Sequence, residues 1–148
     1  MARPLVLSNG SLHAQLDEYG LLRELYYPHV GSESHIAPET AHKIGVWCDG
    51  TLHWCDNGEW QSTQTYIDGA LIGVTTLTNH TIGIILEITD GVAKDYDALL
   101  RSIHVINTQE QPREIVLYLH QAFLISQLTT PDTAQFLPDV HGLLHYKN

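Results

Sequence analysis

The stretch KIGVWCDGTLHWC, residues 43–55, is the part of the sequence that decides the fold. Two short runs rich in Ile, Val, Thr and Trp, which are typical of strands, flank the pair Asp49-Gly50. An Asp-Gly pair between such runs is a strong signal for a two-residue type I′ turn. The stretch therefore predicts a β-hairpin whose register is set by the turn.

The two cysteines lie on opposite strands of this hairpin, but the predicted register keeps them apart. Cys48 faces Thr51, and Cys55 faces Ile44. The cysteines are then about four strand residues, or roughly 13 Å, from each other, whereas a disulfide needs Cα atoms within about 7 Å. We expect two free thiols, as in a reducing compartment. The gap between the cysteines also does not match a zinc-ligand pair, so no metal is expected.

The same strand signals recur along the rest of the chain. Short alternating apolar runs are closed by turn residues about every 8–12 positions, which is typical of an all-β sandwich or barrel. The chain shows no alternation of strands with helices, so the sheets are expected to be antiparallel. Residues 102–106 alternate like a strand. The segment TTPDTAQFL (129–137) instead resembles a helix start and predicts one helical turn.

The C-terminal segment HGLLHYKN (141–148) resembles a strand that has only begun to pair. The sandwich is therefore expected to be incomplete at its C-terminal end, with an open edge. Open strand edges recruit other strands, so the isolated chain is expected to form a homodimer.

Length and charge limit the classes of function. The chain has 148 residues with 43% hydrophobic residues, which suits a single domain over residues 1–148. Its net charge of −10 would repel a phosphate backbone or an anionic membrane. No apolar run reaches the ~18 residues of a membrane span, and the N-terminus does not resemble a signal peptide. We expect a cytoplasmic protein with no nucleic-acid or membrane partner.

Motifs for catalysis are lacking. No nucleotide-binding or nucleophile motif occurs, so no cofactor is expected. A glycosidase needs two carboxylates roughly 5–10 Å apart, and the candidate pairs fall mostly in turns, where solvated acids are common. No catalytic residue is therefore assigned. The candidate pairs are Asp17 with Glu18, Glu33 with Glu39, Asp56 with Glu59, and Asp95 with Asp97.

Aromatic residues and histidines are the remaining candidates for binding. In the predicted hairpin, residues 45, 47, 52 and 54 share one face. Flat aromatic rings stack on sugar rings, but they also form sandwich cores and domain interfaces, and both alternatives stay open. The candidate carbohydrate- or interface-binding residues are Tyr26, Tyr27, His35, His42, Trp47, Trp54 and Trp60.

Five segments occur in an order that carries a family resemblance. They are LSNGSLHAQLDEYGLLRELYYPHVGSESH (7–35), HKIGVWCDGTLHW (42–54), LLRSIHVIN (99–107), REIVLYLHQAF (113–123) and DTAQFLPDVHGLLHYK (132–147). Together they resemble the start of prokaryotic glycoside hydrolase family 15 proteins, which include glucoamylase-, glucodextranase- and trehalase-like enzymes. His29 and Ser34 depart from the family's usual loop, which has tyrosine and asparagine at these positions.

The resemblance implies an N-terminal antiparallel β-supersandwich, of the galactose mutarotase-like class, that precedes a helical-barrel catalytic domain. In the family, two glutamates on that barrel hydrolyse α-glucosidic bonds with inversion, and the barrel is not part of this chain. The resemblance therefore implies a non-catalytic domain that packs against a catalytic barrel in cis and possesses no catalytic residue of its own. The alternatives are a free-standing module that binds α-glucan and an assembly or regulatory domain derived from such an enzyme.

Overall fold

The computed structural model describes residues 4–37, 42–126 and 132–147, and it is an all-β protein. Every strand pairing among these residues is antiparallel, as the sequence predicts. The strands are β1 (Leu5–Ser8), β2 (His13–Leu16), β3 (Leu22–Tyr26), β4 (Lys43–Cys48), β5 (Thr51–Trp54), β6 (Gln61–Tyr66), β7 (Ile72–Asn79), β8 (Ile84–Val92), β9 (Leu99–Asn107), β10 (Val116–His120), β11 (Asp132–Leu137) and β12 (Gly142–Lys147).

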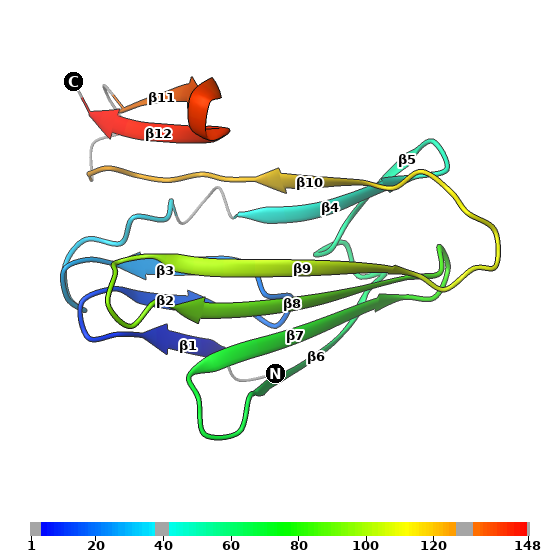
Figure 1. The fold of residues 1–148 in the computed structure, drawn as a ribbon, viewed down its shortest axis with the longest axis horizontal. Helices are drawn as coiled ribbons and strands as arrows, with labels where there is room; N and C mark the ends of the chain where they lie inside the picture. The colour runs from blue at the N-terminus through cyan, green and yellow to red at the C-terminus, as the bar shows by residue number, and fades with distance from the viewer. Residues whose placement is uncertain (1–3, 38–41, 127–131, 148) are drawn as a thin grey trace.

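The architecture is a two-layer sandwich. One layer is the four-stranded sheet β6-β7-β8-β9, and the other consists of two three-stranded sheets, β1-β2-β3 and β10-β4-β5. In Figure 1 the strands β1–β3 overlap one end of the four-stranded sheet, and β1 contacts both β7 and β8. Leu5 packs directly on Gly73 of β7. The contact is so close that a Cβ added at this glycine would lie only 2.7 Å from Leu5 Cδ1.

The hairpin of residues 43–55 forms in the predicted register. Gly45 pairs with Trp54, and Cys48 pairs with Thr51. Asp49 and Gly50 both have positive φ, 50° and 81°, as a type I′ turn requires at its two central positions. Both cysteines are free and buried, which confirms the prediction of two free thiols. Burial raises the pKa of the Cys55 thiol to about 12, so this thiol is not a reactive nucleophile.

Two apolar clusters fill the space between the layers. The first joins β4 to β7 and β8, and the second joins β1–β3 to the ends of β8 and β9. The buried residues of the first cluster are Leu21, Ile44, Val46, Cys48, Cys55, Trp60, Leu77, Ile82, Ile84, Leu86 and Ile88. Those of the second are Leu5, Leu7, Ala14, Leu16, Leu22 and Ile36.

A row of polar side chains on the inner face of the four-stranded sheet separates the two clusters. Along β8 the fully buried Asp90 follows Ile88, and it pairs with Arg101 across the ladder to β9. Arg101 Nε lies 2.6 Å from Asp90 Oδ1, and its Nη2 donates to Asp90 Oδ2 and, at 2.5 Å, to the carbonyl of Gly20. This buried ion pair therefore holds the β2–β3 turn against the sheet.

The C-terminal region differs from the sequence prediction in two respects. The segment 141–148 was expected to have only begun to pair, but β12 pairs with β11 from Gly142 to Lys147. The segment 129–137 was expected to start with a helical turn, but its described part, Asp132–Leu137, is strand β11. This strand pairs along its whole length with β12. For example, Phe136 faces Leu143 and Asp132 faces Lys147. A single 3₁₀ turn, Pro138–Val140, joins the two strands (Figure 1). The expectation of a helical turn at this position was wrong because cross-strand pairing outweighs the local helix signal.

Candidate functional site

The outer face of the sheet β10-β4-β5 brings together two of the predicted aromatic residues. Trp47 pairs with Leu52, and Trp54 pairs with Gly45, so all four lie on one face as the sequence predicts. The Trp54 ring lies against the backbone of Gly45, since a Cβ there would come 2.8 Å from Trp54 Cε3. Gly45 therefore lets the indole lie flat on the sheet.

Strand β10 extends this face with residues that the sequence analysis did not select. Tyr118 pairs with Gly45, so its half-exposed ring lies on the same face as Trp54. Lys43 Nζ lies 6.0 Å from the centre of the Trp54 ring and 3.1 Å from Asp56 Oδ2. Tyr118 is far from the hairpin in sequence, and its alternating context alone does not reveal which strand it joins.

Trp60, the third predicted tryptophan, is not part of this aromatic face. Its side chain is 4% exposed and belongs to the first apolar cluster, so it is a core residue and does not contribute to the exposed face. A sequence pattern cannot separate the two settings, because a tryptophan just before a strand suits either.

Tyr26, Tyr27 and His35 lie together at the end of β3. Tyr26 forms an isolated bridge with Ser34, and Tyr27 is about half exposed. Burial and then the neighbouring Glu24 raise the pKa of the Tyr26 hydroxyl. The His35 N–H donates to the Leu25 carbonyl, the His35 carbonyl accepts from the Leu124 N–H, and His35 Nδ1 lies 3.0 Å from the Leu124 carbonyl. His35 thus fastens this loop to the segment after β10.

His42 is the most buried of the predicted binding histidines. Its side chain makes a hydrogen bond to the backbone of Ala122, and its ring meets Phe123 edge-on at 4.5 Å between centroids. Its Nε2 is buried without a hydrogen-bond partner among the described residues. Burial, helped by the nearby positive charge of Arg101, lowers the pKa of His42 to about 4, although the Ala122 hydrogen bond acts in the opposite direction.

A partly open recess of about 190 Å³ lies beside His42, and its apolar lining residues all belong to the second cluster or pack against it. A smaller hollow of about 50 Å³ adjoins it and shares His42, Arg101 and Gln121. The lining of the larger recess is Leu22, Leu25, His42, Leu99, Arg101, Gln121 and Phe123. The recess thus combines apolar walls with three hydrogen-bonding side chains.

The buried, neutral His42 makes the stability of the protein depend on pH. The unfolded chain binds a proton at this residue below about pH 6.5, whereas the folded chain binds it only near pH 4. The free energy of unfolding should therefore fall by on the order of 2 kcal/mol as the pH drops from about 6.5 to 4. Urea denaturation at several pH values measures this loss.

Two variants control for the other histidines and the carboxylates. His42→Phe removes the titrating group and should flatten the stability profile between pH 6.5 and 4. His104→Ala, at an exposed position on β9, should leave the profile as in the wild type. An unchanged slope in His42→Phe would contradict the assignment to His42.

The candidate carboxylates are engaged in structural contacts. Asp17 Oδ1 accepts the backbone N–H groups of Tyr19 and Leu21, and Arg23 donates to its Oδ2. These bonds fix the turn before β3, and comparable contacts hold other members of the pairs. Asp56 binds Lys43, Glu59 binds His53, and Ser11 donates to Asp97. Glu39 lies outside the described residues, so its pairing with Glu33 has no structural account.

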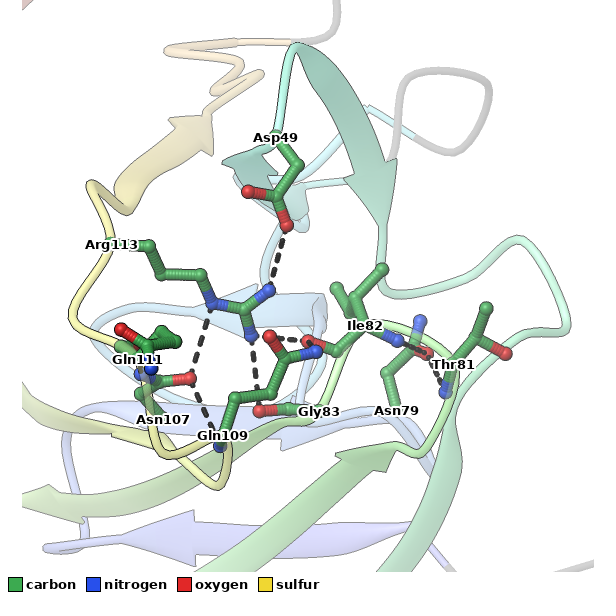
Figure 2. Close-up of polar contacts among 9 residues, drawn as sticks. All are labelled: Asp49, Asn79, Thr81, Ile82, Gly83, Asn107, Gln109, Gln111 and Arg113. Atoms are coloured by element: carbon green, nitrogen blue, oxygen red, sulfur yellow. Dashed lines mark hydrogen bonds and ion pairs between the residues drawn. The ribbon is translucent and has the colours of Figure 1, made fainter.

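Arg113, in the segment between β9 and β10, forms hydrogen bonds with groups from both layers of the sandwich. Its Nη1 donates to Asp49 Oδ2 at 2.8 Å, its Nε donates to Asn107 Oδ1 at 3.1 Å, and its Nη2 donates to the carbonyls of Ile82 and Gly83. Figure 2 shows these bonds converging on one guanidinium from the β4–β5 turn, the β7–β8 turn and the end of β9. The cluster is therefore a structural clamp between the two layers.

Comparison with known proteins relates the chain to glycosyl hydrolases. No family model matches the chain, and no solved structure matches it. The chain is 29% identical over 134 residues to an uncharacterized glycosyl hydrolase of Methanocaldococcus jannaschii. The match covers 90% of this chain but 21% of that protein, so the chain spans about a fifth of the relative's length. Within the described residues, no helix is long and apolar enough to cross a membrane.

Proposed function

We propose that this chain is the non-catalytic N-terminal β-domain of a glucoamylase-like hydrolase of α-glucosidic bonds. In this role it packs against, and supports, a helical-barrel catalytic domain of the same polypeptide. The similarity to a glycosyl hydrolase carries the proposal, because it extends over 90% of this chain yet occupies 21% of the relative. The structural contacts of the candidate carboxylates agree with a role that is not catalytic.

The hairpin β11–β12 offers a surface for such packing. Four apolar side chains on it are 45–70% exposed, and they are Phe136, Val140, Leu143 and Leu144. Phe136 pairs with Leu143, so these two side chains share one face, and exposed apolar side chains grouped in this way are typical of interaction sites. The isolated chain should bury this surface against a second copy, so light scattering at tens of micromolar should give the mass of a dimer. A clean monomer would contradict this use of the hairpin.

The mass of the native protein and its activity test the proposal. An antibody against this chain, used on its source cells, should detect a polypeptide several times heavier than 16.6 kDa. That polypeptide should hydrolyse maltose, isomaltose or trehalose, and the 148-residue chain alone should not. Hydrolysis by the chain alone, or a native mass near 16.6 kDa, would overturn the proposal.

The partly exposed aromatic face of the sheet β10-β4-β5 favours a second candidate function, the binding of α-glucan. The Trp54 ring rests on Gly45, and the neighbouring Tyr118 ring provides a further flat surface. An aromatic ring held flat on a sheet can stack on a pyranose ring, and tyrosine or tryptophan edges add hydrogen bonds.

Replacing Trp54 by alanine should weaken maltooligosaccharide binding by about tenfold or more, because the stacking surface is lost. Gly45→Ala should have a similar effect, since the added methyl group displaces the indole ring. Titration calorimetry with maltoheptaose measures both. Tyr96→Ala serves as the matched control, because Tyr96 is a highly exposed aromatic residue outside this sheet. If Trp54→Ala and Gly45→Ala bind maltoheptaose as tightly as Tyr96→Ala does, the aromatic face has no role in sugar binding.

A further inference from the structure

The recess beside His42 is built differently from the exposed aromatic face. It lies between the layers, and apolar side chains from β3 and β9 line one part of it, among them Leu22 and Leu99. Phe123, His42 and Gln121 come from segments that flank β4 and β10. Segments far apart in the sequence therefore build the lining of this partly open recess.

The charges around the recess balance. Arg101 is part of the lining, and the buried Asp90 carboxylate binds its guanidinium through two hydrogen bonds and neutralises it. His42 is uncharged at neutral pH because the surrounding protein disfavours its protonation. Gln121 is a neutral amide that both donates and accepts. A recess with these groups favours an uncharged ligand over an anion or a cation.

The size of the recess limits the ligand further. A volume of about 190 Å³ is below the ~300 Å³ at which pockets for drug-sized ligands begin. The recess therefore suits one small ring and not an oligosaccharide. Hydroxyl groups would also supply hydrogen-bond donors, which His42 Nε2 lacks among the described residues.

We infer that the recess lined by His42, Arg101 and Gln121 is a binding site for one uncharged sugar ring or a smaller polyol. The apolar side chains and the Phe123 ring contact the C–H surface of the ligand, and the three polar side chains bind its hydroxyl groups. The site is distinct from the Trp54 face. The inference does not depend on the proposed hydrolase role, since it uses only the lining of the recess.

Amide chemical shifts of the full ¹⁵N-labelled chain, titrated with glucose and with glycerol, test the inference. Saturable shifts are expected at the amides of His42, Gln121 and Phe123. Gln121→Ala should weaken binding about fivefold, as expected for one lost hydrogen bond. Leu25→Phe, which fills the recess with a larger side chain, should abolish binding. Tyr96→Ala, at a highly exposed position outside the recess lining, should bind as the wild type does.

Several outcomes would overturn the inference. These are an absence of shifts with both probes, shifts confined to the Trp54 and Tyr118 face, and wild-type affinity in Leu25→Phe. Tighter binding of gluconate than of glucose would also contradict it, because a neutral site gives an anion no advantage. The thermal unfolding of each variant is measured alongside and compared with that of the wild type, so that loss of binding is separated from loss of the fold.

Discussion

Replacing Asp90 by alanine is expected to lower the free energy of unfolding by about 3–5 kcal/mol. The Asp90 side chain is fully buried, and Arg101 lies 2.6 Å from it and is itself 22% exposed. Removal of the carboxylate leaves the guanidinium in a largely buried position without its counter-charge, and this penalty exceeds the value of the lost contact alone. Urea denaturation at pH 7.5 measures the change.

The same pair provides its own controls. Asp90→Asn keeps the shape and part of the hydrogen bonding but removes the charge, so it should destabilise the protein less than alanine does. The double variant Asp90→Leu with Arg101→Met removes both charges, and it should recover much of the stability because apolar residues can replace a buried pair. A loss below about 1 kcal/mol in Asp90→Ala would mean that the pair behaves like a surface ion pair.

Replacing Arg113 by alanine should lower the free energy of unfolding by on the order of 3 kcal/mol, since hydrogen bonds to charged groups contribute about 1.5–3 kcal/mol each and are not additive. The Arg113 side chain is 9% exposed, so the carbonyls of Ile82 and Gly83 would lose a donor in a poorly hydrated place. Differential scanning calorimetry together with urea denaturation measures the loss.

Arg23→Ala is the matched control. Arg23 also binds a carboxylate, that of Asp17, but its side chain is 41% exposed. Exposed ion pairs contribute at most about 1 kcal/mol, so this variant should change stability little. Arg113→Lys retains the charge but loses the planar fork, and it should recover less than half of the loss. Similar effects of Arg23→Ala and Arg113→Ala would show that the clamp in Figure 2 adds nothing to stability beyond a surface ion pair.

The sequence by itself determined the local parts of this structure. Alternation of apolar residues predicted the strands and their antiparallel class, and Asp49-Gly50 set the register of β4 against β5. The distance between Cys48 and Cys55 followed from that register, and both thiols are free. These features depend on neighbours a few residues apart, where the pleat and the turn geometry leave few alternatives.

Only the tertiary structure decided which strands meet and which polar groups share a cavity. A period of two residues tells which side chains share a face, but it does not identify the partner strand. The pairing of β10 with β4 therefore placed Tyr118 beside Trp54. Packing between layers, which no local pattern encodes, buried Trp60, joined Arg101 to Gly20, and brought His42 and Gln121 to one recess.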